Sequence, residues 1–352
     1  MLVEGYVLDR AGAPLTKRAL PQIAASSSDA VVEVDACGLC HTDLAFANGS
    51  VAPKHSLPLV LGHEIVGTVV ETDGAFASLR GRRVLVPAVI PCGDCAFCRA
   101  GRGNACPRQK MPGNDIDGGF ATHVVVPAWA LVPLDDAPAS IDARELGVVA
   151  DAVSTAYQAT RRATLARGDV AVVVGSGGVG GYVIQIARAL GARVIACDTR
   201  AERLDLVARH GAERTVCVEG RAARDVRKEA HAMMREWGVP SLALRIFECS
   251  GTKEGQELAF TMLAQAATLV VVGFSVKPLE LRLSNVMAFD ATLHGTWGCP
   301  PDAYKDVLRL IYAGDVKISP FVEHAPMSCI NEALDNMAHD RLSRRLILDP
   351  RT

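Results

Sequence analysis

A glycine-rich turn directly after an apolar run constrains the fold of this chain more than any other feature. Residues 170–174 read VAVVV, which is typical of a strand buried on both faces. The turn after it contains Gly175, Ser176, Gly177, Gly178, Val179 and Gly180. A helix is expected over residues 178–190 and a second strand over residues 193–197. Together these elements form a βαβ unit, so we predict a parallel sheet.

The same turn predicts a dinucleotide-binding site. Its glycines let a pyrophosphate approach backbone N–H groups at the start of a helix, where the helix dipole favours negative charge. Asp198 ends the second strand, where a carboxylate accepts hydrogen bonds from the adenosine ribose and repels a 2′-phosphate, so NAD is favoured over NADP. Arg200 and Arg203 weaken this preference because both can meet a phosphate, although either can lie solvated at a helix start.

The first part of the chain has a different pattern. Up to about residue 150, short β-branched runs alternate with Gly and Pro, and they predict a strand-rich, barrel-like lobe with strands at residues 30–34, 67–71, 83–86 and 123–126. A chain of 352 residues exceeds a single core, which stops growing at roughly 250 to 300 residues. We therefore expect two domains.

The last part of the chain continues the parallel sheet and then leaves it. Strands are expected at residues 245–248 and 268–272. After about residue 297, a helix over residues 303–313 and a strand over 346–348 form a tail too short to be a domain. We expect this tail to pack on the first lobe.

Four cysteines in one short loop predict a structural metal site. They are Cys92, Cys95, Cys98 and Cys106, with the spacing C-x2-C-x2-C-x7-C. Four thiolates can close a tetrahedron around zinc and leave no position for a substrate. An iron–sulfur cluster is the alternative metal group, and a set of free thiols is the alternative without metal.

A second set of residues predicts an open metal site. Cys40 lies in the motif GLCHTD and His63 in GHE, and Asp151 lies where the strand-rich pattern ends. A catalytic zinc takes three protein ligands and keeps one position open. Zinc bound by Cys40, His63 and Asp151 would bind an alcohol oxygen and lower its pKa, which prepares the carbon for hydride loss.

Three neighbours of these ligands are candidates for further roles. Thr42 can take the substrate proton through its hydroxyl, or it can cap the helix that begins there. Glu64 can ligate the metal or support the ligands from behind. Asp43 can orient His63 through its ring N–H, or it can be purely structural.

Composition excludes several classes of function. The formal net charge is -2, with 49% hydrophobic and 22% charged residues, so we expect a globular enzyme and no nucleic-acid partner. The first thirty residues lack a signal-peptide pattern, and no apolar run approaches roughly 18 residues. Eleven cysteines, an odd number, indicate metal binding and reduced thiols. We expect a cytoplasmic protein without membrane contact.

The Cys40/His63 motifs, the four-cysteine loop and the glycine-rich turn, in this order, resemble the medium-chain zinc alcohol dehydrogenases over essentially the whole chain. The resemblance implies an α/β fold: a GroES-like catalytic domain of residues 1–152 and 300–352, around a Rossmann domain of residues 153–299. It also implies an active cleft between the domains, and homodimers or homotetramers built through the Rossmann domains.

The resemblance further implies roles for single residues. Cys40, His63 and Asp151 fall on the catalytic zinc ligands and Thr42 on the proton-relay hydroxyl. His41 and Arg344 fall on residues that contact the cofactor, with Arg345 as the alternative to Arg344. Two positions depart from the family: the third ligand is more often Cys or Glu than Asp, and Ala45 replaces a histidine of the relay.

A narrower resemblance concerns the substrate. Residues 111–121, 149–153, 246–252 and 282–289 resemble the group of these dehydrogenases that oxidise 6-hydroxycyclohex-1-ene-1-carbonyl-CoA with NAD in anaerobic benzoyl-CoA degradation. It implies a cyclic acyl-CoA thioester as substrate. Three alternatives stay open: a dehydrogenase of small alcohols or polyols, a zinc-free enoyl or quinone reductase, which would lack Cys40 and His63, and a non-enzymatic module that binds zinc or NAD.

Overall fold

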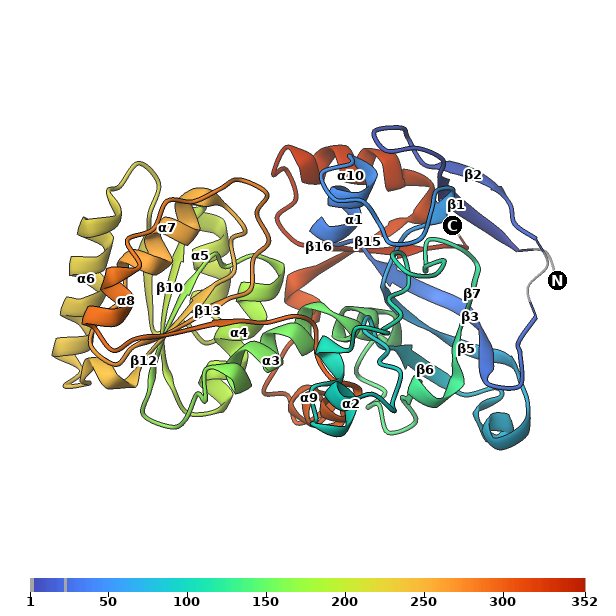
Figure 1. The fold of residues 1–352 in the computed structure, drawn as a ribbon, viewed down its shortest axis with the longest axis horizontal. Coiled ribbons are helices and arrows are strands. Elements are labelled where there is room, and N and C mark those ends of the chain that lie inside the picture. Colours follow the sequence, from blue (N-terminus) through green and yellow to red (C-terminus); the bar gives the residue numbers. More distant parts are fainter. Residues whose placement is uncertain (1–2, 22–23, 352) are drawn as a thin grey trace. The chain divides into compact units, whose positions relative to one another are not determined.

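The computed structural model describes residues 3–21 and 24–351, and it divides into two compact units (Figure 1). The first unit takes in Met1–Ser154, Gly298–Leu308 and Phe321–Thr352. The second takes in Thr155–Trp297 and Arg309–Pro320.

The second unit contains a six-stranded sheet in which every neighbouring pair of strands is parallel. In the order β11-β10-β9-β12-β13-β14, the strand that comes first in the chain, β9, lies inside the sheet, and later strands are added on both sides of it. This is the arrangement of a doubly wound dinucleotide-binding fold. The strands are β9 Val170–Val174, β10 Arg193–Asp198, β11 Arg214–Cys217, β12 Leu244–Glu248, β13 Thr268–Val271 and β14 Thr292–Gly295.

The helices of the second unit connect these strands, and α4, α5 and α7 pack against the sheet (Figure 1). The buried valines of β9 and the apolar residues of β10 and β12 form the core with one face of α6 and α7. The helices are α3 Ala152–Arg162, α4 Gly178–Ala189, α5 Ala201–Ala208, α6 Ala223–Glu236, α7 Lys253–Thr261 and α8 Ser284–Ala288.

The first unit is built on two sheets. The larger has the order β15-β16-β3-β5-β6-β8, with β7 also paired to β3, and the smaller has the order β2-β1-β4. The strands are β1 Glu4–Leu8, β2 Thr16–Ala19, β3 Asp29–Gly38, β4 Leu59–Val60, β5 Glu64–Thr72, β6 Arg83–Val86, β7 His123–Pro127, β8 Val132–Pro133, β15 Val322–Pro326 and β16 Arg345–Asp349. The helices are α1 His41–Ala47, α2 Ala96–Arg99 and α10 Ile330–Ala338, together with α9 Tyr304–Tyr312 up to Leu308.

The C-terminal tail returns to the first sheet, as expected, because β16 pairs antiparallel with β3. One stretch of it differs from the expectation. Residues 309–320 group with the second unit rather than with the rest of residues 300–352. The side chain of Gln185 on α4 explains this: its Nε2 donates to the carbonyl of Lys317 at 3.1 Å, and its Oε1 accepts from the N–H of Lys317 at 2.7 Å.

Most expected strands and helices are present with shifts of one or a few residues at their ends. The strands without a clear apolar pattern were not expected, among them β11 and β14, whose residues are mostly exposed. Among the described residues, no helix is long and apolar enough to cross a membrane.

Candidate active site with two metal-ligand clusters

Strand pairing brings Cys40 and His63 together in the first unit. Strands β3 and β5 pair antiparallel in a register that sets Gly38 opposite Glu64. Cys40 follows the end of β3 and stands at the N-cap of α1, and His63 immediately precedes β5. Both side chains are buried, and their ligand atoms meet at the end of the two strands.

Asp151 completes this group from a break between two helices. It is the single residue between the 3₁₀ helix Ala143–Ala150 and α3, with φ -133° and ψ -66°. Its Oδ2 lies 3.7 Å from Cys40 Sγ and 3.6 Å from His63 Nε2. All three ligand atoms lie within 4.8 Å of one another. The three predicted ligands are therefore close enough to share one ion.

The donor set fits zinc. Typical zinc distances and tetrahedral angles place a sulfur and a carboxylate oxygen about 3.6 Å apart, and a nitrogen and an oxygen about 3.4 Å apart. The observed separations of 3.7 and 3.6 Å are close to both values. In addition, Nε2 of the buried His63, the ring nitrogen that faces Asp151, has no hydrogen-bond partner among the described residues. A buried imidazole in this state fits a bound metal.

Asp43 supports both flanks of the cluster. Its carboxylate is fully buried and accepts the N–H of Cys40 at 2.9 Å and the N–H of Gly62 at 3.1 Å. Its Oδ1 also lies 3.2 Å from His63 Nδ1. Burial by itself lowers the pKa of His63, but Asp43, Asp151 and Cys40 together raise it well above its ordinary value. The predicted orientation of His63 by Asp43 agrees with this geometry.

Glu64 lies behind the cluster and not among its donors. Its Oε1 accepts the N–H of Ala152 at 2.9 Å, and its Oε2 lies 2.9 Å from the guanidinium of Arg345. Burial raises the pKa of Glu64 to about 7, while Arg345 acts against that rise. Since Arg345 and Ala152 hold both carboxylate oxygens, the geometry favours a supporting role for Glu64 over direct ligation.

The two candidate arginines of the tail have different surroundings. Arg344 is exposed and lies 3.6 Å from Glu323. Arg345 is buried, and besides Glu64 it interacts with Cys40, which helps to raise its pKa. Arg345 opens β16 and Arg344 precedes that strand, and only tertiary structure distinguishes two arginines that are adjacent in the sequence. Arg345, predicted only as the alternative to Arg344, is therefore the one of the two that contacts the buried residues behind the cluster.

Thr42 and His41 occupy the first turn of α1. Thr42 Oγ1 lies 3.8 Å from Cys40 Sγ, so the hydroxyl is beside the metal-ligand cluster. The helix is capped by Cys40 and Asp43 instead, which removes helix capping as an explanation of Thr42. His41 is exposed.

The four cysteines form a second cluster around α2. Their sulfur atoms are separated by 3.4 to 3.8 Å in the pairs Cys92–Cys106, Cys95–Cys98, Cys95–Cys106 and Cys92–Cys98. Zinc–sulfur bonds of about 2.3 Å in a tetrahedron give sulfur separations of about 3.8 Å. Hydrogen bonds from the Cys98 N–H and from the neighbouring thiols lower the pKa of Cys95 to about 6. The cluster therefore fits a tetrahedral zinc.

The glycine-rich turn lies between β9 and α4 in the second unit. Gly175 has φ +90°, and a Cβ there would lie 2.6 Å from the backbone nitrogen of Ser250. A Cβ on Gly180 would lie 1.8 Å from the carbonyl oxygen of Gly175. A Cβ on Gly177 would meet no heavy atom within 4 Å. Gly175 and Gly180 are thus required by the turn itself, whereas Gly177 leaves open space at the start of α4.

Asp198 ends β10 beside this turn. Its Oδ2 accepts the N–H of Ser176 at 2.6 Å, and its Oδ1 accepts the N–H of Arg200 at 2.9 Å. A carboxylate has about four acceptor positions, so both oxygens can still accept from a ribose. The guanidinium of Arg200 forms an ion pair with Glu202. Of the two arginines that weakened the preference for NAD, Arg200 is therefore already engaged.

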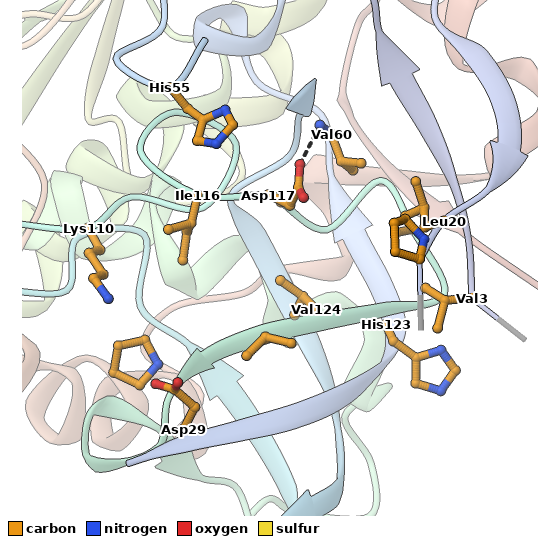
Figure 2. A pocket seen from close by; sticks show the side chains of 15 residues that line it. Val3, Leu20, Asp29, His55, Val60, Lys110, Ile116, Asp117, His123 and Val124 are labelled. Atoms are coloured by element: carbon orange, nitrogen blue, oxygen red, sulfur yellow. Dashed lines mark hydrogen bonds between the residues drawn. The ribbon is translucent and has the colours of Figure 1, made fainter. Parts of the chain in front are cut away.

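A cavity of about 450 Å³ in the first unit lies away from these clusters, since none of the predicted metal ligands lines it. Figure 2 shows its mostly apolar walls, with His55, Lys110 and His123 around them. In its lining, Asp117 Oδ1 accepts the N–H of Val60 at 2.9 Å (Figure 2). The loop over residues 111–121 thus borders this cavity.

The fold and the two clusters define a class: an enzyme with a GroES-like domain, a dinucleotide-binding Rossmann domain and metal sites built for zinc. Comparisons with known proteins agree with this. Residues 26–136 match the alcohol dehydrogenase GroES-like domain, and residues 178–313 match the zinc-binding dehydrogenase family. The chain belongs to the zinc-dependent alcohol dehydrogenase family.

Individual relatives cover nearly the whole chain. An alcohol dehydrogenase of Geobacillus stearothermophilus is 31% identical over 91% of this chain and 91% of its own length. The L-galactonate-5-dehydrogenase of Escherichia coli K12 is 28% identical over 84% of each chain. The alcohol dehydrogenase structure of Aeropyrum pernix is 27% identical, covers 99% of this chain and 100% of its own, and superposes with a TM-score of 0.86.

Proposed function

We propose that this enzyme transfers a hydride from a secondary alcohol carbon to NAD, with zinc held by Cys40, His63 and Asp151. The convergence of these three donors within 4.8 Å, with Thr42 beside them, carries the proposal. When bound, zinc supplies a Lewis acid that makes an alcohol hydroxyl more acidic, and NAD supplies the hydride acceptor. A carboxylate donates less electron density than a thiolate, so Asp151 leaves that Lewis acid stronger than a third Cys would.

The chain's own residues handle the proton. We assign Thr42 Oγ1 as the first acceptor of the substrate hydroxyl proton because it lies at the cluster and does not cap α1. Asp43 and Glu64 keep Cys40, His63 and the backbone beside Asp151 in place through buried hydrogen bonds. At the position of the family's relay histidine this chain has Ala45, which cannot carry a proton. The proton therefore leaves Thr42 by a route that does not use a histidine at that position.

The second zinc has a structural role in this proposal. Cys92, Cys95, Cys98 and Cys106 supply four thiolates and leave no position for a substrate. NAD rather than NADP is the proposed coenzyme because Asp198 presents its carboxylate at the end of β10. The glycine turn over residues 175–180 receives the pyrophosphate, and His41 and Arg344 or Arg345 are proposed as further cofactor contacts.

The proposed substrate is 6-hydroxycyclohex-1-ene-1-carbonyl-CoA, whose allylic alcohol would be oxidised to 6-oxocyclohex-1-ene-1-carbonyl-CoA. The support is the sequence resemblance of residues 111–121, 149–153, 246–252 and 282–289 to dehydrogenases of that thioester. The reaction would belong to anaerobic benzoyl-CoA degradation. A small alcohol or polyol is the second candidate, favoured by the relatives named alcohol dehydrogenase and L-galactonate-5-dehydrogenase.

The experiment that tests this function measures NADH formation at an absorbance of about 340 nm. The purified enzyme is given the cyclic thioester alcohol, simple alcohols and polyols in parallel. Variants Asp151→Ala and Asp9→Ala are compared, since Asp9 is an exposed aspartate of the first unit outside the clusters. Loss of one catalytic ligand is expected to lower kcat by at least about 100-fold, and Asp9→Ala is expected to match the wild type.

Each result has a distinct meaning. Turnover of the thioester alone supports the CoA substrate, and turnover of polyols or simple alcohols alone contradicts it while leaving the chemistry in place. Full activity of Asp151→Ala contradicts the assignment of the third ligand. Coenzyme choice is read from the same assay with NADP in place of NAD.

We also expect homodimers or homotetramers formed through the second unit. Strand β14 ends its sheet with one unpaired edge, and Leu293 on it is 37% exposed. On α8, Met287 is 76% exposed, which is typical of a contact surface.

Thiolate ligands in both clusters require reduced cysteines, which supports a cytoplasmic location.

A further inference from the structure

The backbone on either side of Asp151 needs partners from outside its own helices. Asp151 breaks the helical path between the 3₁₀ helix Ala143–Ala150 and α3, with φ -133° and ψ -66°. The carbonyl of Ala150 and the N–H of Ala152 therefore lie at helix ends, where buried polar groups must be satisfied by other residues. The direction of the Asp151 side chain follows from how these two groups are held.

Residues distant in sequence hold both groups. Glu64 Oε1 accepts the N–H of Ala152 at 2.9 Å. On the other side, the hydroxyl of Tyr304 donates to the carbonyl of Ala150 at 2.6 Å. The N–H of Ala88 reaches the same carbonyl at a longer distance of 3.3 Å. The bond from Tyr304 is thus the shortest contact on the Ala150 side.

Tyr304 is well suited to hold this carbonyl. It opens α9 and its side chain is fully buried, so its hydroxyl exchanges no hydrogen bond with water. Ser154 Oγ lies 3.2 Å from the carbonyls of both Ala150 and Asp151 and 3.5 Å from the Tyr304 hydroxyl. A serine has a single hydroxyl hydrogen, so it serves one of these carbonyls at a time and cannot replace Tyr304.

We propose that Tyr304 is a positioning residue that aims the carboxylate of Asp151 at the metal, through its hydrogen bond to the Ala150 carbonyl. This inference rests on the proposed role of Asp151 as a zinc ligand. Loss of a hydrogen-bonding partner behind a metal ligand commonly weakens metal affinity by about 10 to 100-fold. We expect Tyr304→Phe to weaken zinc binding at the Cys40/His63/Asp151 site by roughly 10-fold, because Ala88 still holds the carbonyl.

The test compares wild type, Tyr304→Phe, Asp151→Ala and Tyr6→Phe. Tyr6 is a half-buried tyrosine on β1 of the same unit and controls for loss of a tyrosine hydroxyl. Zinc affinity is measured by competition with a chelator, and the four-cysteine site serves as an internal reference in every sample. The open site is then loaded with Co²⁺, whose visible absorption reports the geometry of its ligands.

The expected result is weaker zinc binding and an altered Co²⁺ spectrum in Tyr304→Phe, with Tyr6→Phe unchanged and the four-cysteine zinc retained. If Asp151→Ala weakens the site but Tyr304→Phe keeps wild-type affinity and spectrum, the positioning role is overturned and the ligand assignment stands. If Asp151→Ala also binds as the wild type does, the ligand assignment itself is overturned.

A second variant covers the case in which Tyr304→Phe fails to fold. Ser154→Ala removes the hydroxyl that donates to the carbonyl of either Ala150 or Asp151. It takes away only one oxygen atom from α3. The same backbone mechanism predicts a smaller loss of zinc affinity, of roughly 2- to 5-fold, with a spectral change of the same kind. Unchanged affinity and spectrum in a folded Ser154→Ala would count against the mechanism.

Discussion

At the residue scale, Asp198 has two tasks that a single carboxylate can combine. It accepts two backbone N–H groups, from Ser176 and Arg200, and so fixes the end of β10 against the glycine turn. Its negative charge at the same place favours a free ribose over a phosphorylated one. In the proposed function, coenzyme choice and local structure therefore depend on this one side chain.

Asp198→Asn removes the charge and one of the two acceptor oxygens, so only one of the two backbone N–H groups keeps its bond to this side chain. We expect NAD affinity to fall by about 10 to 100-fold, since hydrogen bonds to a charged group contribute about 1.5 to 3 kcal/mol. We also expect the ratio of kcat/KM for NADP to that for NAD to rise. Steady-state kinetics with both coenzymes measures the change.

Asp205→Asn is the matched control, because Asp205 is an exposed aspartate on α5 in the same unit. It is expected to leave both coenzyme constants unchanged. A wild-type preference for NAD in Asp198→Asn would show that another residue sets the choice of coenzyme.

At the element scale, the turn between β9 and α4 uses its glycines for two different reasons. Gly180 is packed against the carbonyl of Gly175, which allows close contact of helix and strand. Gly177 faces open space with an ordinary φ of -73°, so nothing in the protein itself requires a glycine there. In the proposed function, Gly177 keeps this space free for a dinucleotide.

A pair of alanine substitutions distinguishes these reasons. Gly180→Ala is expected to lower both the free energy of unfolding and NAD affinity, because its Cβ would lie 1.8 Å from a carbonyl oxygen. For Gly177→Ala, we expect a free energy of unfolding within about 1 kcal/mol of the wild-type value. We expect the same variant to bind NAD at least about 10-fold more weakly than the wild type. Thermal unfolding and NAD titration check both, and wild-type NAD affinity in Gly177→Ala would refute the assignment of that space.

Elements also show where prediction from sequence stops. Strand β9 was predictable because five consecutive apolar residues precede a glycine turn. Strand β14 was not, because Thr292–Gly295 is short and mostly exposed, and only its pairing with β13 makes it a strand. The contact of residues 309–320 with the second unit depends on Gln185, for which no local pattern exists.

At the scale of the whole molecule, two metal sites with different ligand sets contribute differently to the protein. The four-cysteine site closes a loop of the first unit, whereas the open site lies at the ends of β3 and β5, with Asp151 added from the residue before α3. A structural zinc contributes its binding free energy to folding. The closed site should therefore affect stability more strongly than the open one.

Cys95→Ser tests this expectation. We expect bound zinc to fall from two ions to one per chain, and the free energy of unfolding to fall by about 4 kcal/mol or more, as for other losses of a structural metal. Cys217→Ser is the control, because Cys217 is an exposed thiol of the second unit. Elemental analysis and chemical denaturation measure both, and an unchanged zinc content in Cys95→Ser would contradict the predicted site.

The sequence by itself predicted the class of fold, which the structure confirms, and it named the glycine turn with Asp198, the candidate ligands Cys40, His63 and Asp151, and the four cysteines. The glycine turn and the four-cysteine loop are local, since spacing along a turn or loop carries their physical meaning, whereas the fold brings Cys40, His63 and Asp151 together from three separate segments. Tertiary structure alone decided that Arg345 rather than Arg344 meets Glu64, and that Tyr304 holds the backbone beside Asp151. These contacts join residues 154 or more positions apart, where strand register and helix ends, not neighbours in sequence, set which side chains meet.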